Sequence, residues 1–174
     1  MADRSKSATA RLKKAPSGRQ TDVEIPVQSA AARRSAEAQL ATLIAKFAPA
    51  HLKLVGALRR WLQKRLPSAH EIVYEYRDCF VISYSPNAHG YEGALAVRGS
   101  ADSVKLYFNF GKGLPDPEKL LRGSGKQTRF IEVESASTLA RPEVTRLIDE
   151  AIARTPKPFA RAGRGSVIIQ SIST

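Results

Sequence analysis

Apolar residues recur at two different spacings along this chain, and the spacing changes near residue 70. Between residues 35 and 66 they recur every three or four positions, which is typical of amphipathic helices. From residue 71 to residue 110 they mostly alternate with polar residues, which is typical of strands that have one buried face. The folded part of the chain is therefore expected to begin with helices and to continue with a sheet.

Two helices are predicted before the sheet, and proline marks the end of each. Ser35 is expected to cap the first helix, which ends or bends at Pro49. The second helix is expected over residues 50–66 and stops at Pro67. A third helix is predicted over residues 142–154, which open with a proline suited to a first helical turn.

Five strands are predicted between the second and third helices. The clearest is residues 104–110, where Val104, Leu106 and Phe108 alternate with polar or amphipathic residues. Short strands joined by turns and flanked by helices predict an α+β fold, a two-layer antiparallel sheet of five or six strands with helices packed on one face. The other predicted strands are residues 71–77, 79–85, 93–98 and 129–134.

The two ends of the chain differ from its middle in composition. Residues 1–34 hold eight lysine and arginine residues, three acidic residues and few large apolar ones, so we expect a basic disordered tail. Residues 35–155 are expected to form the α+β domain. Residues 156–174 are expected to be a basic linker followed by an edge strand over residues 166–173. That last run is β-branched and uncharged, and it would favour aggregation if it stayed exposed.

The charge of the chain bears on its partners and its compartment. The net charge of the 174 residues is +12, and basic tails attract polyanions without sequence preference. Weak, salt-sensitive nucleic-acid binding through the tails is one expectation, and a solubilising role is the other. Cys79 is the only cysteine, so one chain can form no disulfide, which fits a reducing compartment. No apolar run reaches the length of a membrane span, and a cytoplasmic protein is expected.

A glycine-rich segment before the last strand of the domain is the candidate site for a small ligand. A short helix is expected to start at Asp116 or Pro117 and to run through Leu121. Residues 123–126 read GSGK, but they lack the first glycine and the hydroxyl of a phosphate-binding P-loop. Amides of glycine turns can still hold one anionic group, or the glycines can simply supply positive φ. The candidate anion- or ligand-binding residues are Gly111, Lys112, Gly113, Gly123, Gly125, Lys126 and Arg129.

Carboxylates on the predicted strands are the candidate metal ligands. Glu71 and Glu75 share one strand, and a solvated sheet face that carries carboxylates suits a cation such as iron. Cross-strand ion pairs with Arg77 and Lys105 explain the same pattern. No nucleophile with a neighbouring base and no cofactor fingerprint is found, so a binding protein is expected rather than an enzyme.

The order of these motifs resembles the YdhG-like domain family over about residues 40–155. The resemblance rests on the strand AHEIVYEY with Glu71, on Phe110 and Gly111 followed by LPDP, and on LLRGSGK followed by Arg129. One member type of that family is described as a frataxin-like iron chaperone. The resemblance thus implies a module that binds a small ligand or iron. The alternative is a module that binds protein or nucleic acid through its basic tails.

Overall fold

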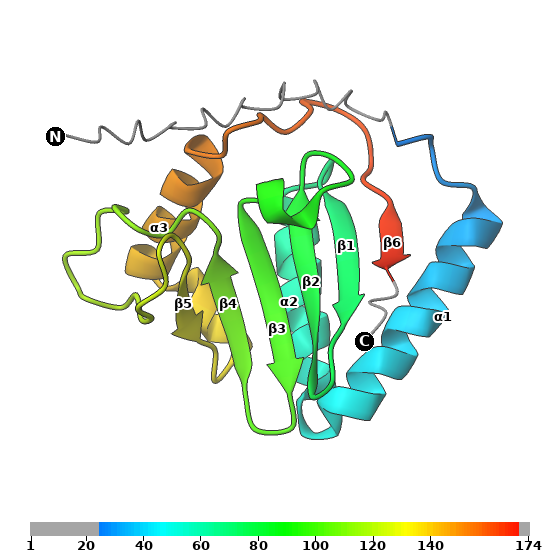
Figure 1. Ribbon diagram of the computed structural model, residues 1–174, viewed down its shortest axis with the longest axis horizontal. Coiled ribbons are helices and arrows are strands. Elements are labelled where there is room, and N and C mark those ends of the chain that lie inside the picture. The colour runs from blue at the N-terminus through cyan, green and yellow to red at the C-terminus, as the bar shows by residue number, and fades with distance from the viewer. Residues whose placement is uncertain (1–24, 171–174) are drawn as a thin grey trace, which may run out of the picture.

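The computed structural model describes residues 25–170, which form a six-stranded sheet with three α-helices on one face (Figure 1). The strand order is β5-β4-β3-β2-β1-β6. All neighbouring strands are antiparallel except β1 and β6, which are parallel. The predicted α+β class is therefore confirmed, with one parallel pair at an edge. The strands are β1 His70–Glu75, β2 Cys79–Ser85, β3 Leu95–Ser100, β4 Val104–Phe108, β5 Arg129–Glu132 and β6 Val167–Gln170.

The helices form the second layer, and α2 and α3 are seen behind the sheet in Figure 1. Within residues 25–170, no single helix is long and apolar enough to cross a membrane. The first helix and the helical segment after it reach that length and composition only as a pair, and the pair is bent by 114°. The α-helices are α1 Ala30–Phe47, α2 Leu52–Arg65 and α3 Pro142–Ala153, and the 3-10 helices are η1 Pro49–His51, η2 Gly90–Glu92 and η3 Ala136–Ala140.

The core lies between the helices and the sheet, and the alternation along β4 is its clearest sequence signal. Val104, Leu106 and Phe108 are buried beneath the helices, whereas Lys105 and Tyr107 point to the opposite face. Complete burial of one such apolar side chain contributes roughly 1.5–3 kcal/mol. The opposite face of the sheet carries no α-helix in the described part of the chain, and we call it the open face (Figure 1).

The first helix begins earlier than the sequence pattern predicts. Ser29 is the N-cap of α1, and its hydroxyl accepts a hydrogen bond of 3.2 Å from the backbone N–H of Ala32. The predicted cap, Ser35, therefore lies inside the helix, and that prediction is wrong. The alanines and arginines of residues 30–34 are strong helix formers, and they extend the helix into the predicted tail. Residues 1–24 of that tail lie outside the described residues.

The short helix predicted after residue 116 is absent, and this segment forms turns. The Asp116 carboxylate accepts hydrogen bonds from the backbone N–H groups of Leu120, at 2.9 Å, and Leu121, at 2.8 Å. Lys119 has a positive φ of 54°, which a helix does not allow. The aspartate thus closes a loop instead of capping a helix.

The segment after α3 crosses one end of the sheet and enters β6 beside β1 (Figure 1). β6 occupies the edge of the sheet, and Ile168 lies opposite Ile72 in the parallel register. The last residues of the predicted edge strand, 171–173, lie outside the described residues. The chain therefore reaches its final strand next to its first one.

Candidate functional site

One cavity of the described chain has a volume of about 760 Å³. Residues of α1, α2, β1, β2 and the linker before β6 line it, so its wall comes from distant parts of the sequence. We call it the Tyr84 cavity. The lining residues that matter below are Arg33, Trp61, Lys64, Glu71, Tyr84 and Arg164.

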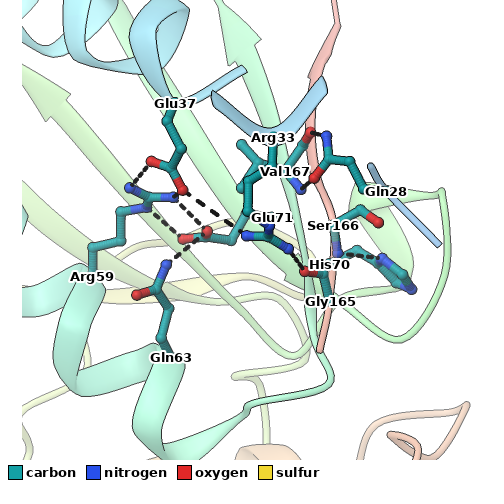
Figure 2. A network of polar contacts seen from close by, with 10 residues as sticks. All are labelled: Gln28, Arg33, Glu37, Arg59, Gln63, His70, Glu71, Gly165, Ser166 and Val167. Carbon is teal, nitrogen blue, oxygen red and sulfur yellow. Dashed lines mark hydrogen bonds and ion pairs between the residues drawn. The ribbon is translucent and has the colours of Figure 1, made fainter. Parts of the chain in front are cut away.

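A buried carboxylate stands at the inner wall of the Tyr84 cavity. Glu71 of β1 is only 3% exposed, because α1 and α2 cover this side of the strand. The Arg59 guanidinium of α2 donates two hydrogen bonds of 2.7 Å to its two oxygens (Figure 2). The side-chain amide of Gln63 donates a third, at 3.0 Å. Since burial of an unpaired carboxylate is costly, the two hydrogen bonds from Arg59 offset the cost of burying Glu71.

A second carboxylate binds the same guanidinium from α1. Arg59 donates hydrogen bonds of 2.6 and 2.8 Å to the oxygens of Glu37. These bonds lower the pKa of Glu37. Burial alone would lower the pKa of Arg59, but its bonds to Glu37 and Glu71 outweigh burial and raise it. The negative charges of Glu37 and Glu71 are balanced by the positive charges of Arg59 and Arg33. The Arg33 guanidinium lies 4.0 Å from the Glu37 carboxylate.

The remaining cations at the Tyr84 cavity form no close ion pair within residues 25–170. Arg60, Lys64 and Arg164 form no ion pair with any described residue, although all three line the cavity. Arg33 donates a hydrogen bond to the backbone carbonyl of Gly165, next to Arg164. Burial and then the charge of Arg164 lower the pKa of Arg33. The cavity therefore carries a surplus of positive charge, which suits an anion.

The hydroxyl of Tyr84 is the one buried side-chain polar atom in residues 25–170 that lacks a hydrogen-bond partner. Tyr84 is 1% exposed and lines the cavity beside Glu71. Burial and then the charge of Glu71 raise its pKa well above the usual range, so the phenol keeps its proton. An unpaired buried hydroxyl costs about 1–3 kcal/mol. Less than 1 Å² of this hydroxyl is exposed, so a ligand oxygen in the cavity can accept its hydrogen bond only after the cavity wall shifts.

Side chains from two other segments hold the linker wall of the cavity against the sheet. The amide of Gln28 donates to the Val167 carbonyl at 2.8 Å and accepts from the Val167 N–H at 3.0 Å (Figure 2). The N–H of Ser166 donates to Nδ1 of His70 at 3.0 Å. Burial lowers the pKa of His70, which favours the neutral ring that this bond requires. Residues 165–167 are thus held at a fixed position.

The two predicted metal ligands, Glu71 and Glu75, lie on one strand but do not meet. Four residues of strand separate their Cα atoms by about 13 Å. Glu71 binds Arg59, and Glu75 pairs with Nζ of Lys46 at 2.6 Å. The prediction that Glu71 lies on the solvated face is wrong, because it is buried under the helices. Within residues 25–170, no three histidine, cysteine, aspartate or glutamate side chains come close enough to hold a metal.

The structure brings together the two ends of the predicted glycine-rich ligand loop. The N–H of Lys112 donates to the Gln127 carbonyl at 2.8 Å, and the Arg129 guanidinium donates to the Gly125 carbonyl at 2.6 Å. Gly111 packs so tightly on Arg129 that an added Cβ would lie 2.6 Å from the Arg129 Cβ. The loop therefore uses the Lys112 amide and the Arg129 guanidinium to close on itself.

Two glycines of this loop adopt the left-handed conformation that tight turns need. Gly113 has φ of 86° and Gly123 has φ of 105°. Arg154 of the segment after α3 donates a hydrogen bond of 2.8 Å to the Gly113 carbonyl. Lys126 is exposed at the tip of the loop. Lys126 of the loop is thus exposed to solvent, whereas the Tyr84 hydroxyl at the cavity is buried.

Sequence reasoning missed the Tyr84 cavity, because its residues come from separate segments and match no motif. One signal was present, since Tyr84 is a residue with a hydroxyl in an otherwise apolar strand position. Comparison of the chain with protein-family models, with curated proteins and with solved structures finds no match. The YdhG-like resemblance stays a sequence-based prediction, and the geometry of the cavity supplies the basis for a function.

Proposed function

We propose that this protein binds a small anionic molecule with an apolar body in the Tyr84 cavity. The observation that supports this most is the group of cations at the cavity, Arg60, Lys64 and Arg164, which form no ion pair with any described residue. Cations gathered at one cavity repel each other in the free protein, and an anionic ligand relieves that repulsion. The charge of this cavity is therefore better explained by binding than by stability.

Positive charge decides the sign of the proposed ligand. Arg60, Lys64 and Arg164 face the cavity without acidic partners in the described chain, while Arg59 neutralises Glu71. A cationic ligand would meet this surplus and be repelled. An anionic group would bind Arg164 and Lys64 and would accept the hydrogen bond of Tyr84, which is a charge-assisted interaction.

The apolar body of the ligand follows from the rest of the wall. Trp61, Leu66 and Ala69 line the cavity together with Pro67. A volume of about 760 Å³ falls in the range of roughly 300–1,000 Å³ that small-molecule sites usually have. Indole faces stack on flat apolar groups. An aromatic phosphate or carboxylate is thus the class of ligand that fits best.

This ligand differs from the iron that the sequence resemblance suggested, although both readings describe a binding protein rather than an enzyme. Arg59 and Lys46 occupy the carboxylates of Glu71 and Glu75. No contact of the described residues favours iron over an anion. The reducing cytoplasm remains the compartment we expect, since Cys79 is free and buried.

Thermal unfolding of the full chain with added ligands tests the proposed function. The probes are phenyl phosphate, inorganic phosphate, benzamidine and ferrous iron. We expect phenyl phosphate to raise the melting temperature most, phosphate to raise it less, and benzamidine to leave it unchanged. At a concentration about 100 times Kd, a ligand selective for the native state stabilises it by roughly 2.7 kcal/mol.

Two pairs of variants separate the cavity from the rest of the surface. Arg164→Ala should abolish most of the shift, whereas Arg161→Ala, an exposed arginine of the same linker, should not. Tyr84→Phe should weaken binding, while the free protein keeps or gains stability. Tyr74→Phe is its control and should leave binding unchanged, because Tyr74 does not line the Tyr84 cavity. An equal shift with benzamidine, or full binding by both Arg164→Ala and Tyr84→Phe, would refute the anion site. Stoichiometric iron lost in Glu71→Gln would favour the chaperone function instead.

A further inference from the structure

The open face of the sheet carries a trough with a floor of small side chains. Two adjoining cavities, of about 340 and 460 Å³, share Tyr76, Val81, Ala96 and Asn109 and therefore form one depression. Its position is independent of the Tyr84 cavity, because Val81 and Tyr84 of β2 point to opposite faces of the sheet. We call this depression the open-face trough.

Aromatic rings stand in pairs around the open-face trough. Tyr74 and Tyr76 of the β1 side have ring centroids 6.5 Å apart. Tyr107 and its cross-strand partner Phe130 have centroids 5.3 Å apart on the opposite side. Tyr91 of η2 stacks on His89 with a centroid distance of 5.4 Å. The rings on this face thus come from β1, β4, β5 and η2, which is typical of a binding surface rather than of a solvated sheet face.

Two of these rings are among the most exposed apolar side chains in the described chain. Tyr76 is 44% exposed and Tyr91 is 63% exposed. Tyr74 is held in place, because its hydroxyl accepts a hydrogen bond of 3.2 Å from the N–H of Gly90. Tyr76 and Tyr91 are therefore available for contact and Tyr74 is already ordered, which reduces the entropy cost of binding.

The sheet register sets the width of the open-face trough. Two strands, β2 and β3, lie between β1 with its tyrosines and β4 with Tyr107. With neighbouring strands roughly 4.8 Å apart, the backbones of β1 and β4 are about 14 Å apart. Val81, Ser83 and Ala96 fill the floor with short side chains. Flat rings can enter this space and stack on the tyrosines.

Unpaired cations lie at one end of the trough. Gln127 and Thr128 line it, and they belong to the loop between β4 and β5. In that loop Lys112, Arg122 and Lys126 are exposed and form no ion pair with any described residue. The N–H of Lys112 bonds to the Gln127 carbonyl, which places the backbone of Lys112 beside a residue that lines the trough.

The charges inside the trough itself are balanced. Arg98 faces Asp78 at 3.7 Å, and Asp78 is largely exposed, so this pair is weak and can open. Lys105 lies over the Phe130 ring and 3.9 Å from Glu132. The positive charge of this face is thus concentrated in the β4–β5 loop, while the trough supplies rings.

We propose that the open face binds single-stranded nucleic acid, with bases stacked in the open-face trough and phosphates on Lys112, Arg122 and Lys126. Aromatic platforms with an adjacent cationic track are the usual means of binding single strands. A duplex is disfavoured, because its bases are already stacked on each other. An apolar peptide would use the rings but not the basic loop. Binding of a single strand in the trough differs from non-specific attraction to a basic tail, because attraction to a tail needs no aromatic side chain.

Fluorescence anisotropy of the full chain tests this surface. The probes are a labelled oligothymidylate of about 12 nucleotides, within the ~4–16 nucleotides that one single-strand-binding fold covers, and a duplex of the same length. We expect tighter binding of the single strand. Tyr76→Ala and Tyr91→Ala should each weaken it by roughly fivefold to a hundredfold. Lys112→Ala and Lys126→Ala should each lower the log–log salt slope by about 0.7.

Matched controls on the helix side complete the experiment. Leu52→Ala removes a similarly exposed apolar side chain from α2, and Lys53→Ala removes an exposed cation beside it. Neither should change the affinity, and unchanged melting temperatures check that every variant is folded. Equal affinity for duplex and single strand with unaffected tyrosine variants would assign binding to residues 1–34 and refute the open-face site. No binding at low salt, or equal losses in Leu52→Ala and Lys53→Ala, would refute it as well.

Discussion

Arg59 of α2 binds Glu71 of β1 through two hydrogen bonds of 2.7 Å, one to each carboxylate oxygen. The pair is shielded from water, since the Glu71 side chain is 4% and the Arg59 side chain 16% exposed. It ties the second helix to β1, the strand next to the sheet edge. It also fixes one wall of the Tyr84 cavity.

The first prediction concerns the difference between two carboxylates of the same strand. Glu71→Gln should lower the free energy of unfolding by about 2 kcal/mol, less than the ~3–5 kcal/mol of a fully buried pair, because Arg59 keeps Glu37. Glu75→Gln should cost no more than about 0.5 kcal/mol, because its pair with Lys46 is exposed. Urea denaturation of both variants measures the difference, and equal losses would contradict the assignment of Glu71 as the buried partner.

The second prediction concerns pH and His70. Burial lowers the folded-state pKa of this ring, whose Nδ1 accepts from the N–H of Ser166. When pH falls below about 6.5, the ordinary histidine value, the unfolded chain takes up the proton first. Stability should therefore fall from that pH down to the folded pKa and be fully present above it. Urea denaturation between about pH 5 and pH 8 measures this.

A variant that keeps the acceptor but not the titration isolates this effect. His70→Asn places an amide oxygen near the position of Nδ1. It should flatten the part of the pH dependence that lies just below the ordinary histidine pKa. An unchanged slope in His70→Asn would assign the pH dependence to other groups.

The third prediction concerns the backbone contact that brings the linker to the sheet. Gly165 lies so close to the carbonyl of Ala69 that any added Cβ would collide with it. Gly165→Ala should therefore displace β6 and its bonds to Gln28. We expect faster amide exchange at Glu71, whose N–H donates to the Ser166 carbonyl, and a loss of ligand binding in the Tyr84 cavity. Gly163→Ala is the control. Gly163 has φ of 99°, but no atom lies close to the position of an added Cβ, so amide exchange at Glu71 should stay slow.

The fourth prediction concerns the start of α1. Ser29→Ala removes the hydroxyl that accepts from the N–H of Ala32, and loss of such a cap costs about 1 kcal/mol. Ser35→Ala should change stability little or raise it slightly, since alanine is the better helix former inside a helix. Thermal unfolding of the two variants compares them, and the reverse order of stabilities would contradict a helix that begins at Ala30.

The strands could be predicted because alternation reports directly on a sheet with one covered face. β2 has the bounds that its pattern predicts, and the apolar residues of β4 are buried as expected. The start of α1 could not be fixed, because Ser29 and Ser35 are equally good caps and both precede helix-forming residues. The sequence shows which residues form a helix more reliably than where the helix begins.

The candidate site was beyond the same reasoning for a physical reason. A glutamate in an alternating strand indicates solvent, and only the approach of Arg59 from another element makes the burial of Glu71 favourable. The Tyr84 cavity likewise depends on Arg33 and Arg164, which no local pattern connects. Cavities form where elements fail to fill space, and spacing along the chain carries little information about that.

The contact between Gln28 and Val167 joins positions 139 residues apart, so it can form only when almost the whole domain has been made. Closing so long a loop costs entropy, and contacts of this kind form late in folding. On the ribosome, Arg33, Trp61 and Tyr84 emerge well before Arg164. The wall of the Tyr84 cavity is therefore complete only after translation has passed β6, and the proposed ligand binding has to wait until then.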